Sequence, residues 1–239
     1  MEIMERFKNK VIVVTGGAKG IGARISECFR SEGAKVEIID KTAGKWFVGD
    51  IAEKSVLDDF ASFVIKKHGK INILINNALP LMKGINEGTW EEFIYAQKVG
   101  VAAPFYLSKL FKDYFPPGSS IINISSSRDR MSQPQTETYT AAKGGLSALT
   151  HALAMSLAPK VRVNSISPGW IDILGYETSE EDNIQQPVGR IGNSDDIASM
   201  VLFLCSEEAG FITGENIVID GGMSHLMIYH GDNGWKLNK

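Results

Sequence analysis

The stretch Lys10-Val-Ile-Val-Val-Thr-Gly-Gly-Ala-Lys-Gly-Ile-Gly22 decides the fold of this chain. Its first half is a run of β-branched residues too short for a helix, and glycines follow at once, which predicts a buried strand that ends in a tight turn. An amphipathic stretch, 21–32, comes next and is closed by Gly33, as a helix C-terminus is. Such glycines let the backbone approach an anion at the N-terminus of the helix. The unit therefore predicts a nucleotide site at this turn, although a tight turn without any ligand would use the same glycines.

The alternation of strand and helix continues along the chain. Further strands are expected at 36–39, 45–48, 71–75, 120–124, 161–166 and 216–219, and helices at 55–68, 90–96, 104–114, 139–157 and 195–205. Strands separated by helices of this length predict right-handed βαβ units and a mostly parallel sheet with helices on both faces. No linker rich in Pro, Gly or Ser divides residues 1–239, so one α/β domain is expected.

Composition excludes several classes of protein. The 239 residues are 44% hydrophobic and 22% charged with a net charge of −3, which is typical of a globular protein and gives no basic surface for nucleic acid. Cys28 and Cys205 belong to no CxxC or Cys/His cluster, so neither a disulfide framework nor a metal site is expected. No apolar stretch approaches the ~20 residues of a membrane span, and the acidic N-terminus is unlike a signal peptide. We therefore expect no membrane partner and a cytoplasmic location.

An acidic residue ends the second predicted strand. Asp40 lies 20 residues after Gly20, where a carboxylate would bind the ribose hydroxyls of an adenosine. An aspartate that merely opens a surface turn before Lys41 is the alternative. A carboxylate at this position would repel the 2′-phosphate of NADP, which predicts a preference for NAD. Lys19 and Lys41 could bind that phosphate, so use of both cofactors stays open.

Tyr139 and Lys143 are four residues apart and share one face of a predicted helix. The spacing alone is weak evidence because it arises by chance in a chain of this size. Its context is stronger: this helix follows the strand 120–124, and Ser126 comes just after that strand. Ser126 and Tyr139 can therefore both reach the carboxyl edge of the sheet, where ligands of such folds bind.

Taken in order, these motifs resemble the short-chain dehydrogenase/reductase family in its single-domain form. The resemblance runs from about Lys10 to Gly222 and implies a doubly wound Rossmann fold, with a seven-stranded sheet of order 3-2-1-4-5-6-7. It rests on the glycine turn 15–22, Asn76-Asn-Ala78, Ser126, Tyr139-x-x-x-Lys143, Arg162-Val-Asn164, Pro168-Gly169, the stretch 187–198, Thr213-Gly214 and Asp220-Gly-Gly222.

The resemblance implies an NAD-dependent oxidoreductase that moves hydride between a nicotinamide cofactor and a secondary alcohol or ketone. Tyr139 would be the general acid and base, Ser126 would hold and polarise the substrate oxygen, and Lys143 would bind the nicotinamide ribose. The ammonium of Lys143 would also lower the pKa of the phenol, which is otherwise near 10. Asn164 would support the loops of the site.

The resemblance also implies a set of cofactor contacts. Asp50 would contact adenine, Asn76 and Ala78 would line the adenosine side, and 168–171 would pass beside the nicotinamide. The predicted cofactor-binding residues are Gly16, Lys19, Gly20, Ile21, Gly22, Asp40, Asp50, Ile51, Asn76, Ala78, Tyr139, Lys143, Pro168, Gly169 and Ile171.

Three positions depart from the family pattern. Leu79 stands where glycine is usual, Gly100 replaces an asparagine that lies at a helix break and helps to hold a water molecule, and Ile173 replaces a threonine. These losses favour an alternative, a dinucleotide-binding sensor or scaffold with little turnover, which the intact Ser126, Tyr139 and Lys143 argue against. A Rossmann-type methyltransferase would explain the glycines but not Tyr139 and Lys143.

The substrate is not readable from the short, acidic stretch 172–186 that corresponds to the family's substrate lid. The family is mostly dimeric or tetrameric, so a homodimer or homotetramer is expected. The tail 223–239 carries Leu226-Met-Ile-Tyr229 and Trp235, which are costly to expose, so it is predicted to pack at a subunit interface.

Overall fold

The computed structural model describes residues 5–229 and 231–232. Seven strands form one sheet in the order β3-β2-β1-β4-β5-β6-β9, and every neighbouring pair is parallel. Numbered along the chain, this is the predicted order 3-2-1-4-5-6-7, so the doubly wound fold is confirmed. The strands are β1 (Val11–Thr15), β2 (Lys35–Asp40), β3 (Phe47–Val48), β4 (Ile73–Asn76), β5 (Ser119–Ile124), β6 (Val161–Pro168) and β9 (Asn216–Ile219).

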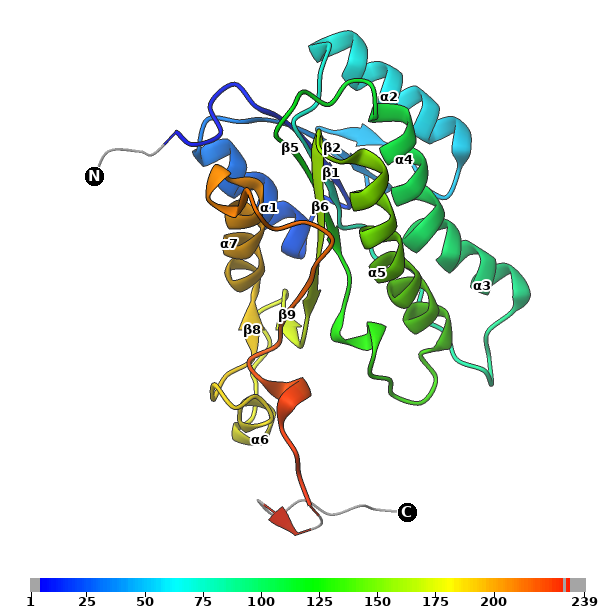
Figure 1. Cartoon of the computed structure of the whole chain (residues 1–239). Helices are drawn as coiled ribbons and strands as arrows, with labels where there is room; N and C mark the ends of the chain where they lie inside the picture. The colour runs from blue at the N-terminus through cyan, green and yellow to red at the C-terminus, as the bar shows by residue number, and fades with distance from the viewer. Residues whose placement is uncertain (1–4, 230, 233–239) are drawn as a thin grey trace.

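Helices cover both faces of the sheet. In Figure 1, α1 and α7 lie on one face, and α2, α4 and α5 lie on the other. The helices are α1 (Gly20–Ser31), α2 (Lys54–His68), α3 (Trp90–Gln97), α4 (Ala103–Phe111), α5 (Glu137–Leu157), α6 (Glu180–Ile184) and α7 (Ser194–Cys205). Two further short strands, β7 (Ile171–Asp172) and β8 (Gly192–Asn193), pair with each other and were not expected from the sequence. No helix in the described part of the chain is long and apolar enough to cross a bilayer.

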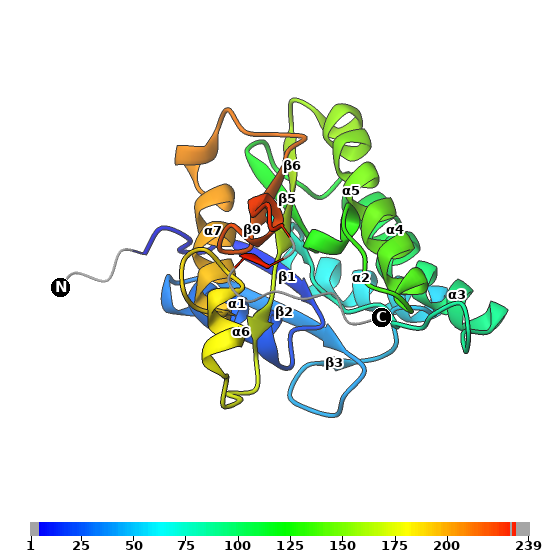
Figure 2. The same ribbon diagram turned by 90° about the horizontal axis from the view of Figure 1, so that it is seen from below.

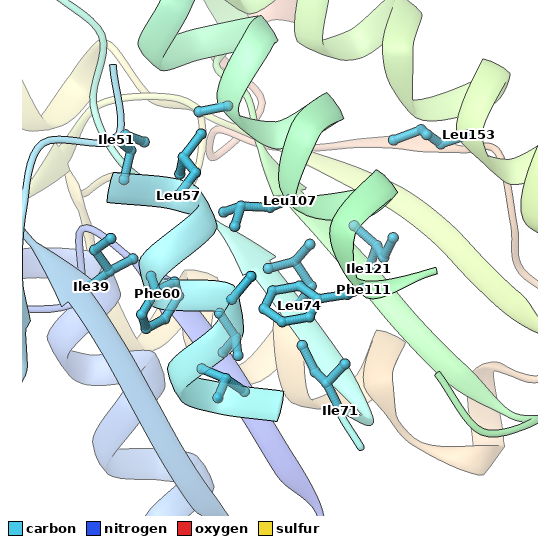
Figure 3. Packing of buried hydrophobic residues seen from close by; sticks show 14 of the residues in the cluster. Ile39, Ile51, Leu57, Phe60, Ile71, Leu74, Leu107, Phe111, Ile121 and Leu153 are labelled. Carbon is cyan, nitrogen blue, oxygen red and sulfur yellow. The ribbon is translucent and has the colours of Figure 1, made fainter. Parts of the chain in front are cut away.

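Two hydrophobic clusters fill the space between the sheet and its helices. Alternate strand residues enter different clusters: Val13 packs toward α2, α4 and α5, whereas Ile12 and Val14 pack toward α1 and α7. Figure 3 shows the first cluster, where Phe60 of α2 and Phe111 of α4 lie over the sheet. A sheet buried on both faces needs apolar residues at consecutive positions, which is why its strands read as continuous β-branched runs.

Three polar residues lie side by side at the carboxyl ends of the central strands. Thr15, Asn76 and Asn123 are partners in the register of β1, β4 and β5. The amide of Asn76 donates to Oδ1 of Asn123 over 2.8 Å, and the hydroxyl of Thr15 accepts the backbone N–H of Asn77 over 3.0 Å. Figure 2 views the molecule from the side on which α6 lies. The loops after these strands therefore leave the sheet at one height and face a common edge.

The helix that contains Gly100 is irregular at the expected place. The sequence predicts two helices, 90–96 and 104–114, but the structure joins α3 and α4 through a π-helical turn, Lys98–Ala102. Pro104 explains it, because proline has no N–H to donate to the carbonyl of Gly100 and its ring would clash with that carbonyl in a regular helix. The turn is closed instead by the N–H of Ala103, which donates to the carbonyl of Lys98.

The C-terminal segment is only partly described. Residues 226–229 lie beyond the 3₁₀ turn Met223–His225 and are exposed, with Met227 74% exposed. Trp235 lies outside the described residues. Packing of this tail at a subunit interface stays a prediction.

Gly100 faces α5 so closely that a side chain there must displace its neighbour. A Cβ at this position would lie 2.7 Å from Cβ of Ala142. Gly100→Ala should therefore destabilise the protein by about 1–3 kcal/mol, the usual cost of overpacking. That corresponds to a melting temperature lower by about 2–4 °C for each kcal/mol in a chain of this length. Thermal denaturation followed by circular dichroism measures it.

Two further variants test the stated contact. Adding Ala142→Gly removes the opposing methyl group and should recover part of the loss, giving a measurable coupling in a double-mutant cycle. Gly144→Ala is the control within α5, because a Cβ there meets only the carbonyl of Asp129 at 3.6 Å. An unchanged melting temperature for Gly100→Ala, or additive effects in the cycle, would contradict the steric account.

Candidate active site

Two cavities adjoin along the carboxyl edge of the sheet. The first, of about 340 Å³, lies over the glycine turn and the end of β2. The second, of about 1040 Å³, lies beside the end of β5 and the start of α5. Lys41, Leu79 and Tyr95 line both. The two cavities therefore form one continuous cleft, which can hold an extended ligand together with a smaller one.

The glycine turn brings backbone close to backbone. Gly16 has a φ of +65°, and a Cβ there would lie 2.7 Å from Cα of Ala78. At Gly22 a Cβ would lie 2.3 Å from the carbonyl oxygen of Gly16. Because both contacts are to main-chain atoms that cannot move aside, only glycine fits at these two positions.

The N-terminus of α1 is open toward the first cavity. Lys19, the N-cap residue, makes no side-chain cap hydrogen bond, and the first turn of the helix carries no acidic residue. The first N–H groups of a helix need acceptors, and the helix dipole favours an anion there. Lys19, Gly20 and Ile21 line the cavity at this point, so these residues fit the phosphates of a dinucleotide.

Two carboxylates line the first cavity. Asp40 accepts the N–H of Ala18 over 3.1 Å through Oδ2 and that of Thr42 over 2.9 Å through Oδ1, which fixes it at the end of β2. Asp50 accepts the hydroxyl of Tyr95 over 2.7 Å. Burial and this carboxylate raise the pKa of Tyr95 to about 12. Asp40 and Asp50 thus both line the first cavity, the one that contains the glycine turn.

The predicted catalytic residues come together at the second cavity. Ser126 and Tyr139 line it, the former two residues after β5 and the latter in the first turn of α5. Lys143 lies beneath: its Nζ is 5.5 Å from the centre of the Tyr139 ring and donates to the carbonyl of Ile124 over 2.6 Å. The four-residue spacing places both side chains on one face of α5, as the sequence suggested.

Burial shifts the pKa values of both Tyr139 and Lys143. Burial raises the pKa of Tyr139, opposed by hydrogen bonding to Ser126 and by the positive charge of Arg128 rather than by Lys143. Burial also lowers the pKa of Lys143 to about 7, because a fully enclosed ammonium loses its hydration. With this pKa, Lys143 is itself only partly charged near neutral pH, and its effect on the phenol stays a prediction.

A family model described as enoyl-(acyl carrier protein) reductase matches residues 16–224 of this chain. The chain belongs to the short-chain dehydrogenase/reductase family. An uncharacterized oxidoreductase of Thermotoga maritima is 38% identical to it over 93% of this chain and 99% of that protein. An NADP-dependent (R)-specific alcohol dehydrogenase of Lentilactobacillus kefiri is 32% identical over 91% and 98%.

The fold of a solved family member is also close. The structure of an apo SCOR enzyme from Clostridium thermocellum superposes with a TM-score of 0.91 at 44% identity, covering 97% of this chain and 99% of that one. The chain is thus an oxidoreductase of the short-chain dehydrogenase/reductase family.

Most of the family-type residues predicted for the cofactor line the cleft. Gly16, Lys19, Gly20, Ile21, Asp40, Asp50, Ile51 and Ala78 line the first cavity, and Tyr139, Gly169 and Ile171 line the second. Four do not line either cavity. Gly22 packs against the glycine turn, Asn76 is bonded to Asn123, Pro168 is buried at the end of β6, and Lys143 lies under Tyr139.

Asn164 and the departures from the family pattern also have defined places. Asn164 is fully buried and donates to the carbonyl of Ile212 over 2.9 Å, which ties β6 to the segment before β9. Leu79 lines both cavities and is 75% exposed. Ile173 lines the first cavity, where its Cδ1 would lie 3.2 Å from a Cβ at Gly20.

Several residues that line the cleft were not predicted from the sequence, among them Asn77 and Arg128. Asn77 lines the first cavity, and its amide donates to the carbonyl of Gly16 over 2.8 Å, which holds the glycine turn against the loop after β4. Arg128 lines the second cavity beside Ser126 and Tyr139. The available signal was position, since Arg128 is the first charged residue after a buried strand at the ligand-binding edge.

Proposed function

We propose that this chain is an NAD-dependent dehydrogenase/reductase that moves a hydride between the cofactor and a secondary alcohol or ketone. The observation that carries the proposal is the placement of Ser126 and Tyr139 in a cavity that adjoins the one over the glycine turn. The rest of the dinucleotide would fill the cavity over the glycine turn. Its nicotinamide would then lie next to a substrate held beside Tyr139. The name of the alcohol dehydrogenase relative supports an alcohol as substrate.

The chemistry divides between the cofactor and the chain. A bound nicotinamide accepts or donates the hydride. Tyr139 takes the hydroxyl proton as the alcohol carbon is oxidised, or donates it in the reverse direction, and Ser126 holds the same oxygen by a hydrogen bond. The glycine turn, α1 and Asp40 hold the dinucleotide at the other end of the cleft.

Lys143 is suited to exchange protons near neutral pH. Its pKa of about 7 lies close to working pH, where a group can both accept and release a proton. It lies under Tyr139 and next to the carbonyl of Ile124, the last residue of β5. We infer that it binds the nicotinamide ribose and connects the phenol to a proton route past the π-helical turn.

The preference for NAD rests on Asp40. Its carboxylate lines the first cavity and is held by the N–H groups of Ala18 and Thr42, so it cannot turn away from a 2′-phosphate without losing both hydrogen bonds. The NADP-dependent relative shows that sequences this similar include users of the other cofactor. A cytoplasmic location and self-association as a dimer or tetramer stay part of this proposal.

Removing the phenol hydroxyl tests the proposed chemistry. Tyr139→Phe should lower kcat by about 10²–10⁴, the usual contribution of a positioned acid or base, while NADH affinity changes little. The measurement is NADH absorbance with a panel of secondary alcohols and ketones, together with NADH binding by fluorescence. Tyr106→Phe is the matched control, because its hydroxyl donates to Asp58, outside both cavities.

Near-normal turnover by Tyr139→Phe would overturn the assigned mechanism. A wild-type protein that binds NADH and turns over none of the panel would instead indicate the alternative, a dinucleotide-binding sensor or scaffold.

Cofactor choice is tested separately at Asp40. The wild type should show a kcat/KM for NAD about 10–150-fold above that for NADP, from the repulsion between the carboxylate and the 2′-phosphate. Asp40→Asn removes the charge and keeps an oxygen acceptor for one of the two N–H groups, of Ala18 and Thr42, that the carboxylate accepts. The ratio of kcat/KM for NAD to that for NADP should therefore narrow. Asp58→Asn, on α2 outside the cleft, should leave it unchanged. Equal or better kcat/KM with NADP in the wild type would contradict the assignment.

A further inference from the structure

Arg128 brings a positive charge into the cavity that holds the catalytic residues. It lies in the 3₁₀ turn Ser127–Asp129, two residues after Ser126, and lines the second cavity together with Ser126 and Tyr139. Its backbone N–H donates to Oγ of Ser126 over 3.2 Å, which ties the two residues together. The charge is close enough to the phenol to oppose the rise of its pKa. Any substrate oxygen held by Ser126 and Tyr139 is therefore near this side chain.

The contacts of this guanidinium are both uncharged. Nη1 donates to Sδ of Met82 over 3.1 Å, and Nη2 donates to Oε1 of Gln133. Within residues 5–229 and 231–232, no carboxylate lies at ion-pair distance from it, although Arg130, next but one in the chain, pairs with Asp129. A guanidinium has five N–H donors in a planar fork, so two neutral contacts leave donors for a ligand.

Two acidic residues lie near Arg128, one next to it in the sequence and one on the wall of the same cavity, and both are hydrogen-bonded to other groups. The carboxylate of Asp129 is buried and accepts the hydroxyl of Ser147 over 2.7 Å, together with the amide of Asn216. Asp182 lines the cavity, but its Oδ2 accepts the N–H of Ser179 over 3.0 Å in the cap of α6. Neither neutralises Arg128.

The wall of the second cavity carries large apolar side chains as well as polar ones such as Ser132 and Gln133. Met82, Met131 and Trp170 line it, as does Leu79. A half-buried charge beside apolar walls loses hydration, and a carboxylate restores the loss through two parallel N–H···O bonds. Arginine suits this task better than lysine because its planar fork matches a carboxylate.

We propose that Arg128 binds a carboxylate of the substrate, so that the enzyme interconverts hydroxy acids and oxo acids. This inference rests on the proposed function. In the oxidation, the C–H bond of the alcohol carbon breaks, and hydride, carrying two electrons, reduces the NAD. The hydroxyl proton goes to Tyr139 and then to water, and the carbon becomes a carbonyl. The substrate carboxylate stays bound at Arg128 throughout and takes no part in bond breaking.

The test compares substrates that differ only in charge. Pyruvate, 2-oxobutanoate, acetoacetate and levulinate are each paired with the methyl ester, and NADH oxidation gives kcat/KM for both members. The wild type should favour the best acid over its ester by about 10–100-fold, the range for hydrogen bonds to a charged group. Arg128→Gln should abolish this preference, and Arg128→Lys should keep part of it. Arg6→Gln, which removes a surface arginine paired with Glu32, should keep it fully.

Each outcome decides the question. Reduction of esters or other neutral ketones without any advantage for the acids contradicts the role of Arg128 and leaves the proposed function in place. If Arg128→Gln lowers kcat/KM equally for the acid and its ester, the result also contradicts carboxylate binding by Arg128. An equal loss would mean that the side chain has a structural role only. Failure to reduce either class, with NADH bound, overturns both this proposal and the proposed function.

Discussion

The parallel register of β1, β4 and β5 is the constraint on which the site depends. It sets Thr15, Asn76 and Asn123 at one level, so that the glycine turn, the loop through Ala78 and the turn through Ser126 begin at the same edge. The amide of Asn76 donates to Asn123, and the hydroxyl of Thr15 accepts the backbone N–H groups of Asn77 and Ala78, which holds these strand ends together across the sheet. A shift of one residue in any pairing would exchange the side chains that fill the two hydrophobic clusters, so packing of the core enforces the register and the register places the site.

A second constraint holds α5 against that edge. The hydroxyl of Ser125 donates to the carbonyl of Lys143 over 3.0 Å and is bonded to Ser147, which donates to the buried Asp129. Asp129 also accepts from Ser167 and Asn216, so the network joins α5 to β6 and β9. The first half of α5 is thereby fixed with Lys143 enclosed beneath Tyr139. This enclosure, which removes the ammonium from water, is what lowers the pKa of the lysine.

Much of this arrangement could be predicted because its causes are local in the sequence. The strand-turn-helix unit at 10–32 has a clear pattern of apolar residues, and glycines stand where the backbone turns tightly. The positions of Asp40, Ser126, Tyr139 and Lys143 follow once the sheet is parallel, because each lies just after a strand or in the first turns of a helix. The order of the strands came from the resemblance to the family, since composition and periodicity do not set which strands are neighbours.

The remaining features depend on contacts between distant segments. The π-helical turn follows from Pro104. The close approach of Gly100 to Ala142 depends on how α5 packs against this turn, which the sequence does not give. The pairing of β7 with β8 joins two dipeptides too short to carry a pattern. The pKa values of Tyr139 and Lys143 depend on burial, which the sequence does not give. Arg128 was overlooked because a charged residue after a strand is most often a surface residue.

The central claim is that one edge of the sheet holds the dinucleotide and presents its nicotinamide to Tyr139. A crystal structure of the protein with NAD bound tests this most directly. The account predicts adenosine beside Asp40 and Asp50, phosphates at the N-terminus of α1, and the nicotinamide ribose within hydrogen-bond reach, ~3.2 Å, of Tyr139 or Lys143. NAD bound elsewhere, or bound over the glycine turn with its nicotinamide directed away from Tyr139, would contradict it.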